Sequence, residues 1–359
     1  MKITRVFYAL LISCCFMVFP NYAISSELPA NWPWRGVTLN NLETNPEDVK
    51  MLKEKLGINS IRITLKVRHL AALQKISSTE ALNRTIKWAD AVLDTCREVG
   101  VAGIISVSEF PMDPSLGLTQ DSPDFWGNAR LLTDAVKTAG RLADHFRSRG
   151  KELAAYEFFN EPLLKEDRKQ ILPPSYERLR KDIVSEIRKY DAKRWIVITP
   201  GLGGLPAGYR GYKPLEDPYI VYGAHMYQPH PFTHQGINER KVGVTYPGVI
   251  NGRNWDKKQL KSVLEPLREF QVKYGVPVWI GEFSAARWAE GGERYLVDLV
   301  EVFNSYGWGW AVFNFKGYHA WNPDYDTVYR SDKPDDWKKS FLGDTSTRWK
   351  TLKKLFKLP

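Results

Sequence analysis

Short apolar runs rich in β-branched residues alternate with longer amphipathic stretches along most of the chain. The runs, each a strand candidate, are residues 34–39, 60–65, 102–107, 154–159, 195–199, 220–225, 276–281 and 309–315. Helical patterns lie at residues 45–57, 80–99, 125–148, 175–190, 257–274, 293–306 and 346–356, whereas residues 201–218 carry no clear helix. This alternation predicts parallel strands joined by right-handed crossovers.

Eight strand–helix units fit a closed (β/α)8 barrel, the TIM barrel, whose active site lies at the carboxyl ends of the strands. The length of 359 residues also allows two average domains, but no linker, repeat or low-complexity tract divides residues 27–359. An open doubly wound sheet usually carries a glycine fingerprint after its first strand, and Gly36-Val37-Thr38-Leu39-Asn40 is not one. We therefore predict a single α/β barrel domain over residues 24–359.

Residues 1–23 have the pattern of an export signal. Two basic residues precede an apolar stretch from Val6 to Phe19, acids are absent, and small or polar residues lie near Ala23. This pattern is typical of a cleaved signal peptide and predicts a secreted or periplasmic protein without stable membrane insertion. The alternatives are an uncleaved anchor and lipid attachment at Cys14, although the hydrophobic residues after Cys14 speak against a lipid tether.

Composition and charge exclude or disfavour several classes of protein. The hydrophobic share of 43% and charged share of 26% exclude wholesale disorder. Loss of residues 1–23 leaves 49 Lys and Arg against 41 Asp and Glu, a net charge of +8. These cations are scattered, so the pattern does not favour nucleic-acid binding. Cys96 would then be the remaining cysteine, so the fold must be stabilised by its core rather than by disulfides. We also expect a monomer.

Two carboxylates follow apolar strand candidates on opposite sides of the predicted ring. Glu161 comes after the fourth run and Glu282 after the seventh. Two carboxyl groups that face each other across a cleft are what glycosidic cleavage requires, since one protonates the leaving oxygen while the other attacks the sugar or activates water. Each acid alone could instead cap a helix or pair with a lysine.

Four motifs together resemble glycoside hydrolase family 5 over essentially the whole mature chain. They are Phe159-Asn160-Glu161-Pro162, His225-Met226-Tyr227, Phe232-Thr233-His234-Gln235-Gly236 and Ile280-Gly281-Glu282-Phe283. The resemblance implies a retaining double displacement with Glu161 as acid/base and Glu282 as nucleophile. It also implies no cofactor and a polysaccharide or oligosaccharide as the binding partner.

The same resemblance assigns roles to the neighbouring residues. Arg62 matches the family's arginine beside the nucleophile, and its charge would keep Glu282 ionised. Asn160 would hydrogen-bond the sugar 2-hydroxyl, Tyr227 would hold the nucleophile, and His225 would line the same wall. A buried structural ion pair is the alternative for Arg62.

Two positions depart from the family pattern. Ser108 stands at the end of the third strand where members usually carry a histidine, and Phe313 stands at the eighth where they usually carry a tryptophan. These departures bear on substrate choice more than on the reaction. Candidate sugar-stacking residues in loops are Trp126, Trp255, Trp288, Trp321 and Trp337, of which Trp321 is the best placed.

The histidines at positions 225, 230 and 234 suggest a metal site, but Pro229 and Pro231 would break a helix that aligned them, so we predict none. The sequence therefore favours an endo-β-1,4-glucanase-like hydrolase, with mannan, xyloglucan or exopolysaccharide as other substrates. The rivals are a carbohydrate-binding barrel with little catalysis and a metal-dependent barrel lyase or hydrolase.

Overall fold

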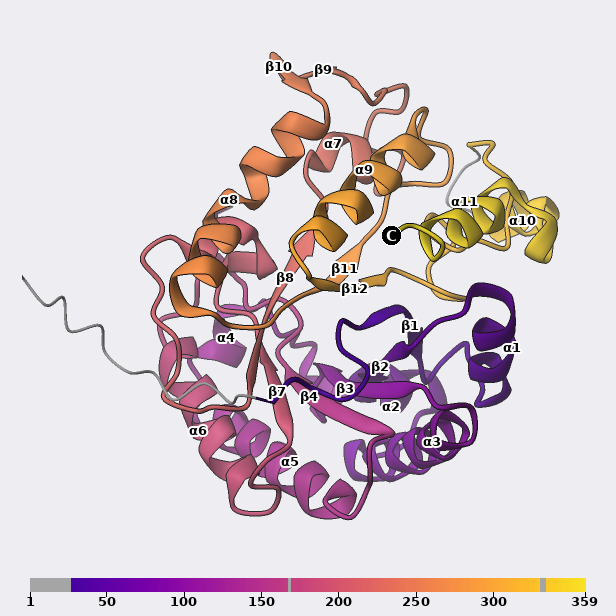
Figure 1. Ribbon diagram of the computed structural model, residues 1–359. Coiled ribbons are helices and arrows are strands. Elements are labelled where there is room, and N and C mark those ends of the chain that lie inside the picture. Colours follow the sequence, from indigo (N-terminus) through magenta and orange to yellow (C-terminus); the bar gives the residue numbers. More distant parts are fainter. Residues whose placement is uncertain (1–26, 167–168, 330–333) are drawn as a thin grey trace, which may run out of the picture.

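A computed structural model describes residues 27–166, 169–329 and 334–359. Its centre is a closed parallel barrel in the order β1-β12-β11-β8-β7-β4-β3-β2 (Figure 1). The barrel strands are β1 (Arg35–Asn40), β2 (Ser60–Lys66), β3 (Ala102–Glu109), β4 (Leu153–Phe158), β7 (Trp195–Ile198), β8 (Ile220–Met226), β11 (Val278–Phe283) and β12 (Gly309–Val312). The (β/α)8 architecture predicted from the sequence is thereby confirmed.

Helices surround the barrel (Figure 1). They are α1 (Glu47–Leu56), α2 (Val67–Gln74), α3 (Ser78–Val99), α4 (Pro123–Trp126), α5 (Ala129–Phe146), α6 (Tyr176–Arg188), α7 (His230–Thr233), α8 (Lys257–Tyr274), α9 (Gly292–Ser305), α10 (Pro334–Trp337) and α11 (Thr347–Leu355). Short 3₁₀ turns are η1 (Pro114–Leu116), η2 (Leu202–Gly204), η3 (Pro206–Tyr209), η4 (Lys338–Ser340) and η5 (Gly343–Thr345). Helix α11 contacts both α9 and α1 and so completes the ring.

The differences from the predicted elements have local causes. The helix expected over residues 125–148 is divided, because the Asn128 side chain accepts from the backbone N–H groups of Arg130 and Leu131 and starts α5 anew. The eighth strand ends at Val312 rather than at residue 315. Helix α2 was not predicted, nor were the hairpins β5 (Leu164–Glu166)–β6 (Lys169–Ile171) and β9 (Gly248–Ile250)–β10 (Arg253–Trp255).

The predicted signal peptide, with Cys14, lies outside the described residues and stays a prediction. Within residues 27–166, 169–329 and 334–359, no helix combines the length and the apolar character needed to cross a bilayer. Cys96 is buried, and burial raises the pKa of its thiol to about 12, so it behaves as a small core residue.

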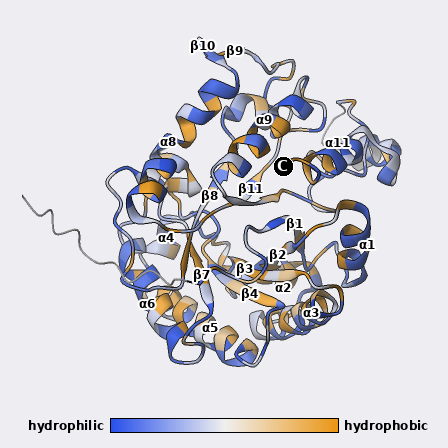
Figure 2. Ribbon diagram, viewed as in Figure 1, coloured by the Kyte–Doolittle hydropathy of each residue, from blue (hydrophilic) through white to orange (hydrophobic). Residues whose placement is uncertain are grey.

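Two apolar clusters hold the fold together. The larger one fills the space between the strands and the helices, whose residues alternate between hydrophilic and hydrophobic in Figure 2. The smaller one fills the barrel interior, where Trp34 and Trp279 meet edge to face with ring centroids 5.8 Å apart. The polar site lies directly above the indole of Trp279.

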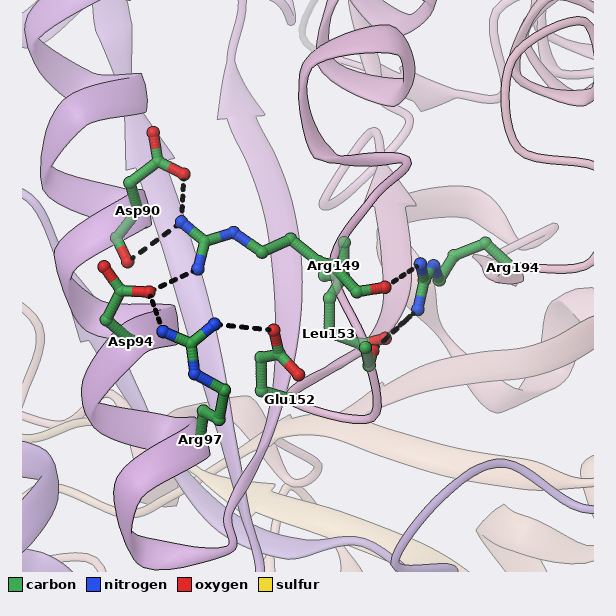
Figure 3. A network of polar contacts seen from close by, with 8 residues as sticks. Asp90, Asp94, Arg97, Arg149, Glu152, Leu153 and Arg194 are labelled. Carbon is green, nitrogen blue, oxygen red and sulfur yellow. Dashed lines mark hydrogen bonds and ion pairs between the residues drawn. The ribbon is translucent and has the colours of Figure 1, made fainter.

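A polar network ties the amino-terminal ends of neighbouring strands together (Figure 3). Arg149, in the loop before β4, contacts Asp90 and Asp94 of α3, and the distance from its guanidinium to Asp94 is 2.5 Å. Arg194, just before β7, donates to the carbonyl oxygens of Arg149 at 2.7 Å and Leu153 at 2.5 Å. Since this end of the barrel is opposite the carboxyl ends of the strands, the network serves stability.

We expect Arg149→Met to lower the free energy of unfolding by about 1–3 kcal/mol, because two carboxylates lose a cation whose side chain is only 15% exposed. Urea unfolding followed by circular dichroism measures this change. The matched control is Arg147→Met, whose side chain is 61% exposed and pairs with Asp144, and its effect should stay below about 0.5 kcal/mol. Equal effects of the two substitutions would contradict a structural role for the network.

Candidate active site

A bulge in β11 aims Glu282 into the barrel mouth. The pairing of β11 with β8 shifts register between Ile280, opposite Ala224, and Glu282, opposite His225. Gly281 occupies the shift, and a Cβ there would lie 3.0 Å from the Trp279 ring. Bulges of this kind redirect a side chain next to an active site, so Glu282 and His225 come to lie side by side.

The chain leaves β4 through a left-handed residue that directs Asn160 and Glu161 to the same mouth. Phe159 has φ 61°, which is costly for a side chain without glycine's freedom. Its ring is buried among aromatic rings, with centroids 4.7 Å from Phe110 and 5.3 Å from Trp126. This packing offsets the strain. The sequence prediction extended the strand to Phe159, which is one residue too far.

Arg62 of β2 lies at the base of the site and is fully buried. Its guanidinium contacts Glu157 at 2.7 Å and also bonds to Glu282 and Asn160. Burial would lower the pKa of Arg62, but the charges of Glu157 and Glu282 outweigh it and raise the pKa. The arginine is therefore a permanent cation that connects strands β2, β4 and β11.

Glu282 is held in its ionised form by its surroundings. Its side chain is 8% exposed, the Tyr227 hydroxyl donates to it at 3.0 Å, and His225 Nδ1 lies 3.9 Å away. Burial would raise the pKa of Glu282, but the charges of His225 and Arg62, with hydrogen bonds from Arg62 and Tyr227, hold it below 4.5.

Glu161 faces the cleft with 39% of its side chain exposed and has His225 as its partner. The distance from His225 Nδ1 to Glu161 Oε1 is 2.8 Å, so the two groups can share a proton. Burial would lower the pKa of His225, but the charges of Glu282 and Glu161 and the bond to Glu161 raise it above 6.5. Gly204 permits this arrangement, since a Cβ there would lie 3.1 Å from the imidazole.

The two carboxylates are close together. An oxygen of Glu161, an oxygen of Glu282 and a nitrogen of His225 all lie within 4.8 Å of one another. Retaining glycosidases place their carboxyl groups about 5–5.5 Å apart, whereas inverting ones need about 6.5–9.5 Å for a water molecule. With an upper limit of 4.8 Å between one oxygen of each carboxylate, this chain lies nearer the retaining geometry than the inverting one.

The cavity above the carboxylates has a volume of about 620 Å³. It is hereafter the carboxylate cavity. Its lining includes Phe313 and Trp321, whose ring centroids are 5.6 Å apart, and Tyr227 lies 6.0 Å from Trp321. The indole nitrogen of Trp321 donates to the Thr233 carbonyl at 3.3 Å, which fixes the ring.

Ser108 lies outside the carboxylate cavity, in a neighbouring cavity of about 280 Å³ that also touches Asn160 and Glu161. Its hydroxyl is 3.4 Å from the Leu65 carbonyl. The oxygen of Asn160 accepts from Arg62, so its amide nitrogen remains as a donor toward this second cavity, hereafter the Ser108 cavity.

The structure separates the five candidate tryptophans. Trp321 lines the carboxylate cavity, whereas Trp126 is 5% exposed and donates to the Leu163 carbonyl at 2.9 Å as a loop anchor. Trp288 donates to the Gln235 carbonyl at 2.9 Å. Trp337 stacks on His319 with centroids 4.7 Å apart, and Trp255 lies near a separate pocket. Trp126, Trp288 and Trp337 therefore act as loop anchors rather than as sugar platforms, because tertiary contacts hold their rings.

The histidines at 225, 230 and 234 do not gather around one point. Pro229 and Pro231 do not prevent a helix, because proline is tolerated in a first turn, and α7 begins beside them. His230 and His234 stack on each other with centroids 3.8 Å apart. In the described part of the chain, the group with ligand-like spacing is Glu161, His225 and Glu282.

Sequence reasoning missed Glu157, which is buried and bonds Arg62. The available signal was an acid inside an apolar strand candidate, since a charge buried in a strand requires a partner. It also missed Trp279 beneath the guanidinium, 5.9 Å from the Arg62 carbon to the ring centroid. The sequence does not tell on which face of the strand a tryptophan side chain lies.

A (β/α)8 barrel that brings two carboxylates together at the carboxyl ends of its strands defines the class of barrel glycoside hydrolases. Comparison with family models makes the assignment specific. Residues 26–319 match the cellulase family, glycosyl hydrolase family 5, and the chain belongs to that family.

Individual relatives are more distant. Endoglucanase C of Acetivibrio thermocellus is 26% identical over 193 residues, which cover 46% of this chain and 54% of that protein. The chain thus spans about half the length of the curated relatives it matches. Among solved structures, a hyperthermophilic endo-β-1,4-glucanase in complex with substrate has a TM-score of 0.66 at 20% identity, covering 89% of this chain and 96% of that one. Thermotoga maritima Cel5A in complex with mannotriose gives 0.62 at 21%, covering 86% and 96%. Both likenesses show the fold.

We expect Tyr227→Phe to move the acidic limb of the kcat/KM profile to higher pH by about one unit. The hydroxyl bond favours ionised Glu282, so its loss raises the pKa of that carboxyl and protonates it at a pH where the native site is still charged. The shift is measured from kcat/KM on a soluble β-glucan between about pH 3 and pH 8. Tyr190→Phe, on an exposed ring, is the control. An unmoved limb would show that the hydroxyl does not tune Glu282.

Proposed function

We propose that this protein is a retaining glycoside hydrolase that cleaves inside a β-linked glucan, in the manner of an endo-β-1,4-glucanase. The observation that carries the proposal is the close pair Glu161 and Glu282, with one carboxylate exposed to the cleft and the other buried and held ionised. Family membership and the similarity to curated endoglucanases support the same function.

In the first step, a carboxylate oxygen of Glu282 attacks the anomeric carbon while the bond to the leaving oxygen breaks. The proton shared by Glu161 and His225 passes from Glu161 to that oxygen. In the second step, ionised Glu161 removes a proton from water, and the water oxygen displaces Glu282 from the anomeric carbon. The product keeps its configuration, and both carboxyl groups return to their starting states.

Electrostatics give the two acids their different roles. Arg62 and Tyr227 favour the ionised form of Glu282, as a nucleophile requires. Asn160, fixed by Arg62, is placed to donate to the sugar 2-hydroxyl, an interaction that strengthens in the oxocarbenium-like transition state. Phe313 and Trp321 offer ring faces for the apolar sides of the sugars.

The carboxylate cavity shares wall residues with two further pockets. The Ser108 cavity shares Glu161 and Leu163 with the carboxylate cavity. A third pocket shares Gln228 and His230 with the carboxylate cavity on the other side. Space on both sides of the bond to be broken supports internal cleavage of a chain.

Two further parts of the proposal rest on the sequence. We infer that the protein acts as a monomer outside the cytoplasm, after removal of residues 1–23. The second candidate function, a carbohydrate-binding barrel with little catalysis, is motivated by Ser108 and Phe313. The hydrogen-bonded and ionised state of Glu282 favours the enzyme, because binding alone does not require a buried charged nucleophile.

We expect Glu282→Gln to reduce turnover by roughly 10⁴-fold or more, the order seen when an enzyme loses its nucleophile. A 2-deoxy-2-fluoro glycoside with a good leaving group should trap an ester on the native protein, and mass spectrometry of peptides should locate it at Glu282. The control is Glu269→Gln on the outside of α8, which should retain activity. Full hydrolysis by Glu282→Gln would refute the assignment, and polysaccharide binding without reducing-end release would favour the rival function.

Product sizing tests the internal mode of cleavage. With neutral β-1,4-glucan, mixed-linkage glucan, xyloglucan and mannan, we expect short oligomers of several lengths from one backbone. A soluble polymer should also lose viscosity before much reducing sugar appears, because early cuts fall in mid-chain. Release of a single disaccharide from the start, at unchanged viscosity, would contradict endo action.

A further inference from the structure

A third pocket, hereafter the hairpin pocket, continues the cleft beside the β9–β10 hairpin. Its volume is about 400 Å³, and it shares Gln228 and His230 with the carboxylate cavity. Arg210, which follows η3, and Arg253 and Trp255 of β10 contribute to its wall. A glycan that extends from the carboxylates in this direction would reach these side chains.

The hairpin is built to hold its arginine in place. Asn251 and Gly252 have φ values of 51° and 73°, the pair of left-handed residues that a tight two-residue hairpin turn requires. The antiparallel pairs Arg253–Ile250 and Trp255–Gly248 follow directly. Arg253 and Trp255 are two residues apart on one strand and so share a face. Trp255 is 8% exposed, which anchors this face against the barrel.

The charge of the hairpin pocket is unbalanced. Arg210 and Arg253 are exposed, no carboxylate contributes to the lining, and neither guanidinium makes an ion pair within the described ranges. Burial and the charge of Arg240 lower the pKa of His230, which leaves that residue neutral at pH 7. The pocket therefore presents two unpaired cations.

The Ser108 cavity, at the opposite end of the cleft, provides the comparison. Its cations Arg68 and Lys165 are accompanied by Glu109 and Asp121, and Lys165 pairs with Asp121. The positive charge of the cleft is thus concentrated at the hairpin end. Two arginine forks with no protein partner suit an anion with several oxygens, which they can bind bidentately.

We propose that the hairpin pocket binds a sugar residue that carries an ionised acid group, so that the enzyme prefers an anionic derivative of its β-glucan. The proposal rests on the proposed glycan hydrolase function and names the class of its substrate. The ionised group, a carboxylate or a sulfate or phosphate ester, binds away from the broken bond and holds the chain in register for cleavage at Glu282.

The test compares three soluble polymers of matched length: neutral hydroxyethylcellulose, carboxymethylcellulose and cellulose sulfate. In the double variant Arg210→Gln/Arg253→Gln, we expect kcat/KM on an anionic polymer to fall about 5- to 10-fold, with a change below about 2-fold on the neutral one. Salt at about 0.5 M should bring the native protein close to the variant, since it screens exposed charges. Arg147→Gln, at the opposite end of the barrel, removes one exposed arginine and should change nothing.

Each outcome decides one question. A loss confined to carboxymethylcellulose or to cellulose sulfate supports the proposal and identifies the acid group. An equal loss on all three polymers, or no loss on any, overturns it while leaving the hydrolase function intact. If the native protein releases no reducing ends from any polymer, the proposed function itself fails, and binding of the same polymers to the native protein then tests the pocket separately.

Discussion

The site depends on one buried cation. Arg62 has no contact with solvent, and a guanidinium in that position is stable only if carboxylates surround it. Glu157 and Glu282 supply the charge, Asn160 accepts a further bond, and Trp279 lies beneath the guanidinium. Because these partners come from separate strands, the arginine fixes the relative positions of the groups that act on substrate. Its removal would leave Glu157 buried without its cation and would take away one of the two positive charges that hold Glu282 ionised.

Local backbone features bring the carboxylates to that cation. The bulge at Gly281 turns Glu282 toward His225, and the left-handed Phe159 turns Glu161 toward the same imidazole. Each feature is supported by packing, since Trp279 lies against the first and a group of aromatic rings surrounds the second. The result is one exposed and one buried carboxylate around a shared histidine, which is how one site can provide both an acid and a nucleophile.

Charge along the cleft connects the site to the basic character of the chain. The excess of cations is scattered in the sequence, but the fold places Arg210 and Arg253 on one pocket without acids, while acids balance the cations at the Ser108 end. Because the two ends of the cleft differ in charge, an extended glycan with ionised groups would bind in one orientation. The carboxylates at the centre would then meet a defined bond of the chain.

The sequence by itself determined the barrel, the two carboxylates and the family, because strand–helix periodicity and short motifs are local in the chain. Arg62, Asn160, His225 and Tyr227 were also found in this way, and the structure places all four around Glu161 and Glu282. Tertiary structure alone decided the partner of Arg62 in β4, the burial of Trp126 and the gathering of two arginines at a hairpin. These depend on contacts between residues far apart in sequence, and whether a side chain faces a cavity or a neighbour is fixed only when the elements pack.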